Sequence, residues 1–169
     1  MAASQWGVVA LAATTLMRAT TGYRSPDGFG GGGGIPVYFG PEPGITGDRV
    51  FSYLIIGWSG DPDNPQPAGD VTQDPGPISP QRARDERGDI RCRAVIQNGE
   101  TSVAAFEAAV TAAYQIVADV ESLTRTNPTL GLPQPTMKWA FVTAGGPLLE
   151  FNGGAVASVD FTVTYEARL

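Results

Sequence analysis

Residue types that carry enzymatic chemistry are scarce in this chain of 169 residues, which has no histidine and a single cysteine. Without histidine the chain lacks the usual general base, the Ser-His and Cys-His catalytic pairs and the commonest zinc ligand. The cysteine, Cys92, lies in an alternating apolar segment, so we expect a small buried side chain rather than a reactive thiol. A lone cysteine also excludes an intrachain disulfide.

Two segments share features with ligand-binding loops, but the residues beside them do not fit. The five glycines 30–34 lead into Ile35-Pro36-Val37, without the lysine and the helix start that a phosphate-binding loop needs. Asp61-Pro62-Asp63-Asn64 resembles the start of a calcium-binding loop, but Pro65 and Gln66 break the alternating ligand pattern. A solvated acidic loop is the simpler interpretation there, and a weak cation site is the alternative. We therefore expect no catalytic residue, no cofactor and no metal, and we expect that the protein is not an enzyme.

A third segment, residues 82–93, concentrates charge. It holds five arginines and three acids in a chain whose formal net charge is -6. Because the acids alternate with the arginines, they are expected to neutralise one another locally rather than form a catalytic carboxylate pair. The functional interpretation is a subunit interface or a surface facing nucleic acid, and the alternative is ordinary surface ion pairs. The candidate interface or lumen residues are Arg82, Arg84, Arg87, Arg91 and Arg93.

The composition favours a single domain spanning residues 1–169. Apolar residues make up 42% of the chain and charged residues 17%, and neither a signal peptide nor a membrane span is expected. The acidic charge gives no general attraction for nucleic acid or for an anionic membrane. Glycine and proline, 22 and 14 residues, gather in two stretches, which predicts flexible loops at 25–34 and 59–84.

Apolar periodicity predicts two helices and several strands. One helix is expected from Ala3 to Thr21, and a longer one from Ser102 to Thr124 with Thr101 or Ser102 as its N-cap. Strands are expected at Ile35–Phe39, Arg49–Trp58, Ile90–Ile96, Met137–Thr143, Leu148–Phe151 and Ala155–Arg168, with a turn at Gly145-Gly146-Pro147. This order predicts an α+β fold, in which a mostly antiparallel sheet packs against two α-helices as an α/β sandwich, with long Gly- and Pro-rich loops.

The order of these elements resembles one family. A charged strand entry, residues 87–96, precedes the long alanine-rich helix, and the chain closes on Phe161-Thr162-Val163-Thr164-Tyr165-Glu166-Ala167-Arg168. This pattern is similar to the tail terminator (tail completion) proteins of siphophages, the long-tailed bacteriophages, and of related gene transfer agents. The glycine-rich insertion 28–34 and the long proline-rich loop depart from that family.

The resemblance implies a structural virion protein without catalysis. It implies a homo-oligomeric ring, a hexamer, at the head-proximal end of the tail, assembled in the host cytoplasm. The ring would halt polymerisation of the major tail tube protein and join the tail to a head-completion or neck protein. DNA would pass through the lumen without sequence-specific binding, and no membrane would be involved. Within such a ring we expect loop 59–84 to contact a neighbouring subunit or an adjacent ring.

Two other classes of function remain open at the level of sequence. One is a different phage connector or tail tube subunit, such as a head-closure, neck or major tail protein; these are richer in β-structure, so the helix 102–124 would be hard to place. The other is a small enzyme or a cellular ligand-binding domain, which would present a pocket.

Overall fold

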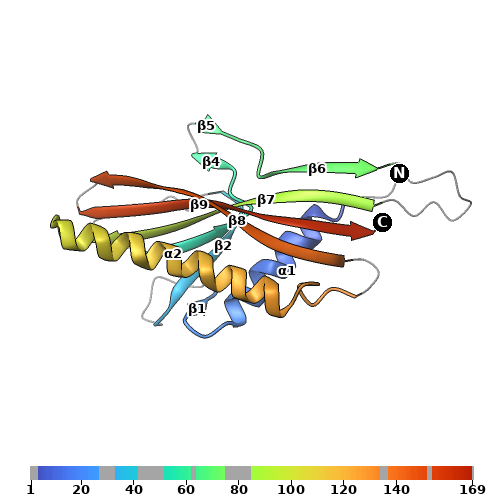
Figure 1. The fold of residues 1–169 in the computed structure, drawn as a ribbon, viewed down its shortest axis with the longest axis horizontal. Helices are drawn as coiled ribbons and strands as arrows, with labels where there is room; N and C mark the ends of the chain where they lie inside the picture. Colours follow the sequence, from blue (N-terminus) through green and yellow to red (C-terminus); the bar gives the residue numbers. More distant parts are fainter. Residues whose placement is uncertain are drawn as a thin grey trace, which may run out of the picture.

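Two helices and a mixed seven-stranded sheet form the described part of the chain (Figure 1). The structure is a computed structural model, and it describes residues 4–26, 33–41, 52–61, 64–74, 85–133, 137–151 and 154–168. The helices are α1 (Trp6–Ala19) and α2 (Val103–Thr126). The strands of the sheet are β1 (Tyr23–Arg24), β2 (Ile35–Phe39), β3 (Tyr53–Ile56), β6 (Gly69–Asp74), β7 (Asp85–Asn98), β8 (Met137–Phe151) and β9 (Ala155–Arg168). A separate small hairpin consists of β4 (Gly60–Asp61) and β5 (Asn64–Pro65).

The strand order is β1-β2-β3-β7-β9-β8, and β6 also pairs with β7. Strands β1, β2 and β3 run parallel to one another, whereas the pairings β3–β7, β6–β7, β7–β9 and β9–β8 are antiparallel. β3 pairs with the second half of β7, where Ile56 lies opposite Cys92, and β6 pairs with the first half. Along the chain, the β4–β5 hairpin lies between β3 and β6 and is not part of this sheet. This architecture confirms the predicted α+β class.

Both helices pack on one face of the sheet. α1 covers β1, β2 and β3, and α2 covers β7, β8 and β9, while the β4–β5 hairpin lies on the other side (Figure 1). The alternation predicted for β7 is confirmed, because Ile90, Cys92 and Ala94 are fully buried under the helices. The same is true of β9, whose buried residues on that face are Ala157, Val159, Phe161, Val163, Tyr165 and Ala167.

The other face of the sheet, which we call the outer face, carries the alternate side chains of β7, β8 and β9. A small apolar cluster of Tyr53, Ile55 and Val95 is buried at one end of it. Most of the outer face of β7 and β9 is polar and charged; its side chains there include Arg87, Asp89, Arg91, Arg93, Asp160, Thr162, Thr164 and Glu166.

The ends of α2 follow the predicted signals. Ser102 is the N-cap, and its Oγ accepts a hydrogen bond of 3.1 Å from the backbone N–H of Ala105. The helix ends at Thr126, with Asn127 as the C-cap before Pro128. By length and composition alone α2 could cross a membrane, but seven of its residues are buried against the sheet, as in the core helix of a folded domain.

Several details of the predicted secondary structure were wrong. The stretch 59–84 was expected to be irregular, but it contains β4, β5 and β6; β6 was missed because its sequence is polar and its exposed edge carries no apolar alternation. Gly145-Gly146-Pro147 is not a turn, because β8 runs through it with a register shift between Ala144 and Pro147. The first helix ends at Ala19 rather than Thr21.

Other expectations fall partly outside the described residues. Of the strand expected at Arg49–Trp58 the structure describes residues 52–58, and only Tyr53–Ile56 is a strand. Gly57 has φ of +76°, and its N–H and that of Trp58 both donate to the carbonyl of Arg91, which turns the chain off the sheet. Residues 27–32, 62–63 and 75–84 of the two expected loops lie outside the described residues.

Candidate functional site

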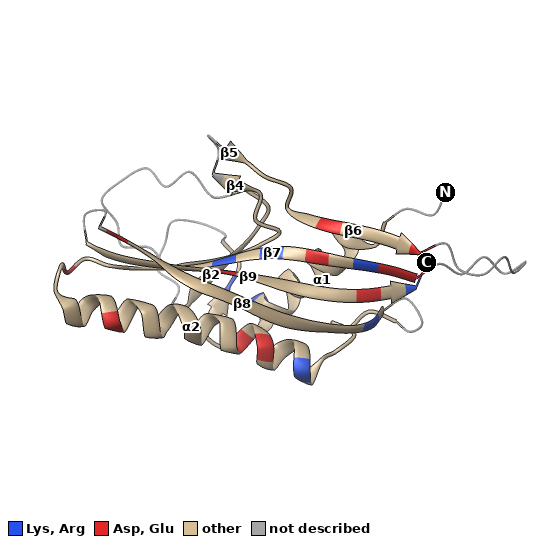
Figure 2. Cartoon of the chain, turned by 45° about the horizontal axis from the view of Figure 1, so that its top comes forward, with Lys and Arg blue, Asp and Glu red and all other residues tan. Residues whose placement is uncertain are grey.

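Three of the five arginines that the sequence singled out lie on β7 and face the outer side of the sheet. They are Arg87, Arg91 and Arg93; Arg82 and Arg84 lie outside the described residues. Figure 2 shows charged residues of both signs gathered on β6, β7 and β9. Each of these three arginines pairs with side chains of the same chain.

Arg93 is held on two sides. Its Nε and Nη2 donate to the two carboxylate oxygens of Asp160 on β9, at 2.7 and 3.0 Å. Its guanidinium carbon also lies 3.6 Å from the centroid of the Trp58 ring. A two-pronged pairing of this kind and a cation–π contact both fix the plane of the guanidinium. Arg93 therefore connects Trp58, just before the β4–β5 hairpin, to β9 in the interior of the sheet.

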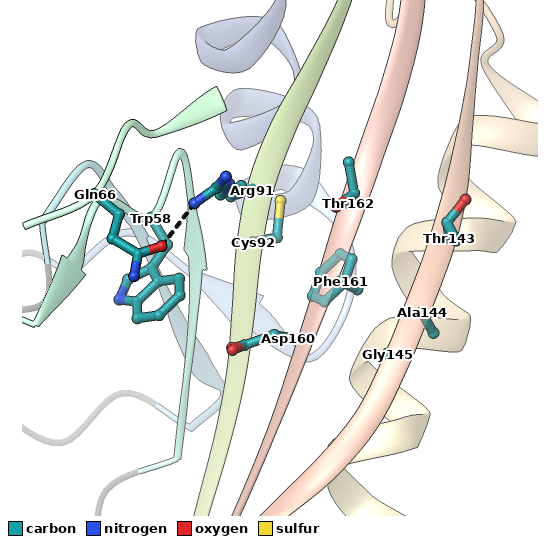
Figure 3. Close-up of a pocket in the computed structure, with 10 residues that line it drawn as sticks. All are labelled: Trp58, Gln66, Arg91, Cys92, Thr143, Ala144, Gly145, Asp160, Phe161 and Thr162. Atoms are coloured by element: carbon teal, nitrogen blue, oxygen red, sulfur yellow. Dashed lines mark hydrogen bonds between the residues drawn. The ribbon is translucent and has the colours of Figure 1, made fainter. Parts of the chain in front are cut away.

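Arg91 lies at the mouth of a pocket on the outer face. Its Nη1 donates to Gln66 Oε1 at 2.9 Å, and its Nη2 lies 3.8 Å from Asp70 Oδ2. The pocket has a volume of about 380 Å³ and is lined by Trp58, Gln66, Arg91, Cys92, Thr143, Ala144, Gly145, Asp160, Phe161 and Thr162 (Figure 3).

The pocket is lined by both apolar and polar side chains, and the polar ones offer no reactive pair. Thr143 and Thr162 lie opposite each other across β8 and β9, and both line the pocket. The Trp58 indole N–H is buried without a partner among the described residues. Hydroxyl, amide and guanidinium groups in such an arrangement can bind a polar group, but none of them is a nucleophile with an adjacent base.

A second charged cluster joins the ends of three strands. Lys138 Nζ contacts Glu166 Oε1 at 2.6 Å and Asp85 Oδ2 at 2.8 Å. Arg87 Nε contacts the other oxygen of Glu166 at 3.1 Å, and Arg168 lies 3.8 Å from Asp85. The hydrogen bond from Lys138 lowers the pKa of both carboxyl groups, and the hydrogen bonds to Asp85 and then Glu166 raise the pKa of Lys138.

The arginines therefore lie among acids and do not form a uniformly positive surface. Pairing within the chain does not exclude a contact with a neighbouring subunit or with DNA, so the interface or lumen role of Arg82, Arg84, Arg87, Arg91 and Arg93 stays a prediction. The sequence could not reveal the internal pairing, because Arg93 and Asp160 are 67 positions apart and Arg87 and Glu166 are 79.

The described residues offer little for covalent or metal chemistry. Cys92 is fully buried, and burial raises the pKa of its thiol to about 12, which keeps it protonated at neutral pH. Among the described residues there is no group of three or more cysteine and acidic side chains placed to hold a metal ion.

One surface feature, the exposed edge of the sheet, could not be predicted from the sequence. β8 is an edge strand, and its large apolar side chains Phe141, Leu148 and Leu149 are 48, 52 and 51% exposed. Phe141 also stacks on Trp139, with ring centroids 5.2 Å apart. The apolar run around the Gly-Gly-Pro segment has the composition of a buried strand, so only the position of β8 in the sheet distinguishes it from one.

No protein-family model and no curated protein sequence matches this chain.

Proposed function

We propose that this chain is a structural virion protein, a tail terminator subunit with an α/β sandwich fold that forms a ring at the head-proximal end of a siphophage tail. The ring consists of six copies, halts polymerisation of the tail tube and joins the tail to the head-completion protein. DNA passes through its lumen without sequence-specific contacts.

One observation carries the proposal, namely the position of α2 and β9. The closing strand that bears the family resemblance, Phe161 to Arg168, lies in the interior of the sheet between β7 and β8, and the 24-residue helix α2 covers all three strands. A helix that supplies a large part of the core is an integral layer of the domain. This supports the terminator over head-closure and major tail tube subunits, in which more of the chain is β-structure.

The surface of the subunit supports an assembly role over a catalytic one. The pocket lacks a nucleophile with a base, and three of the exposed large apolar side chains lie together on a strand edge, where protein partners commonly bind. A small ligand-binding domain remains the competing candidate, because the pocket of about 380 Å³ is large enough for a small polar molecule.

The test is to inactivate the gene in the phage that encodes this chain and to measure tails by electron microscopy. The proposal predicts tails longer than normal and of variable length, none of them joined to heads, with normal tails restored by the chain supplied from a plasmid. Tails of normal length joined to heads in the absence of the chain would overturn it.

A further inference from the structure

We propose that the free chain pairs with a second copy of itself, edge to edge through β8, as a two-fold antiparallel dimer. This contact goes beyond the ring contacts of the proposed function, and it covers the exposed edge before the subunit joins any larger assembly.

The edge of β8 presents unused hydrogen-bonding capacity. Its backbone pairs with β9 on one side and with no other strand of the described residues. Side chains from Phe141 to Glu150 are exposed or half-buried, over ten of the strand's 15 residues. A long apolar edge of this kind is a template for another strand, and monomeric proteins normally protect it with charges or cover it. Here the only charged residues of β8 are Lys138 and Glu150, one near each end (Figure 2).

The distribution of apolar side chains along β8 favours a copy of the same strand. Phe141 lies before the register shift between Ala144 and Pro147, which we call the bulge, and Leu148 and Leu149 lie after it. Antiparallel self-pairing brings the first half of one copy against the second half of the other, and a two-fold axis makes this happen twice. All the exposed large apolar side chains of the strand are then covered by one contact.

The bulge makes the two faces of the strand match in this arrangement. Before it, odd-numbered residues share the outer face, since Phe141 lies opposite Thr164; after it, even-numbered residues do, since Leu148 lies opposite Ser158. A register that places Phe141 opposite Leu148 of the second copy therefore puts outer side chains against outer side chains. The same register puts Ala140 opposite Leu149 on the helix-covered side.

The charges at the ends of the paired strands and the small residues at their centre also favour this register. Glu150 comes to lie opposite Trp139 of the second copy and next to its Lys138, so opposite charges meet at both ends. At the centre lie Ala144, Gly145 and Gly146, which have no side chains large enough to hold the two strands apart. Pro147 has no N–H, so the backbone pairing rests on the two flanks of the bulge.

The register can be tested by disulfide cross-linking, because the native Cys92 is buried and should form no cross-link itself. Phe141→Cys and Leu148→Cys are made in separate chains. Under mild oxidation, a mixture of the two should form covalent dimers, whereas neither alone should, since like positions lie about seven residues apart in the paired strands. As a matched control, Phe141→Cys is mixed with Leu11→Cys, whose parent side chain on α1 is also 52% exposed, and no dimer should form.

Light scattering on the full chain gives the second readout. The expected mass is twice 17.6 kDa. Leu148→Lys should weaken dimerisation on the order of 10- to 100-fold, because it puts a charge in place of an apolar side chain that the dimer covers, whereas Leu11→Lys should leave it unchanged. A monomeric parent chain, or equal cross-linking by the control pair, would overturn the β8 dimer. A ring of six without the 141–148 cross-link would overturn it too, while leaving the proposed function supported.

Discussion

Glu86 is the residue that connects the most parts of this fold. Its side chain is on the helix-covered side of β7 and is fully buried. One carboxylate oxygen accepts from Ser4 Oγ, from the backbone N–H of Gln5 and from the hydroxyl of Tyr165, at 3.1, 2.9 and 2.7 Å. The other accepts from Gln73 Nε2 at 2.9 Å. The start of α1, β6, β7 and β9 are all joined through this one side chain.

Glu86→Ala should lower the free energy of unfolding by about 3 kcal/mol, because it leaves four hydrogen-bond donors without their acceptor, one of them the buried hydroxyl of Tyr165. Glu86→Gln, which keeps one acceptor oxygen, should lose less. Urea denaturation measures both. A loss below about 0.5 kcal/mol for the alanine variant would show that water replaces the carboxylate there.

Arg93 offers a second test at the scale of the residue. Arg93→Ala should cost about 1–2 kcal/mol of unfolding free energy, because it removes both the paired hydrogen bonds to Asp160 and the stacking on Trp58. Arg87→Ala is the matched control, since Arg87 also pairs with an acid on β9 but its side chain is 66% exposed, and it should cost less than about 1 kcal/mol. Equal costs would mean that the Trp58 contact contributes nothing.

At the scale of the element, two glycines differ in the space that is available for a side chain. A Cβ on Gly88 of β7 would lie 2.5 Å from the ring of Tyr165, whereas a Cβ on Gly7 of α1 would meet no atom within 4 Å. Gly7→Ala should therefore stabilise the protein by about 0.5–1 kcal/mol through helix propensity. Gly88→Ala should destabilise it by about 1–3 kcal/mol through overpacking. Thermal and urea unfolding of both variants would check the signs, and a stabilising Gly88→Ala would contradict the packing of Tyr165 on β7.

The ion pairs that join the ends of β7, β8 and β9 should give stability a dependence on pH. The lowered pKa values of Asp85 and Glu166 mean that their contribution is present above the ordinary carboxyl pKa, about 4, and is lost as the pH falls through their lower folded values. The raised pKa of Lys138 means that its contribution is present below its ordinary pKa and is lost as the pH rises through the raised one.

Lys138→Met should therefore flatten the dependence of the urea midpoint on pH at both the acid and the alkaline end. Arg125→Met is a suitable control, because Arg125 pairs with Glu121 within the exposed face of α2 and joins no strands. Unchanged acid and alkaline limbs in Lys138→Met would show that the cluster does not couple the three strands.

The elements differ in how far their sequence predicts them, and the difference has a physical cause. α2 and β9 were predicted well, because each buries one regular face, and Ser102 supplies a local cap. β6 was missed because its hydrogen bonds to β7 depend on a partner strand and not on its own polar sequence. The Gly145-Gly146-Pro147 segment was misread because its composition is typical of turns, whereas pairing with β9 carries the strand through it. For the candidate site, the sequence located the arginines but not their distant acidic partners.

At the scale of the whole molecule, the face of the sheet under the helices forms the core, whereas the outer face and the β8 edge are accessible to other molecules. The helix-covered face buries the main core, the outer face pairs its own charges around a pocket, and the β8 edge leaves apolar side chains exposed. This division fits the proposed assembly role, in which contacts with other chains would carry the function.

The most direct test of the terminator proposal adds the purified full chain to tail tube subunits from the same phage while they polymerise. The proposal predicts that tube growth stops on addition, and that electron micrographs show one six-membered ring on one end of each tube. Continued growth with bare tube ends, at concentrations of the chain well above that of the tube ends, would contradict it.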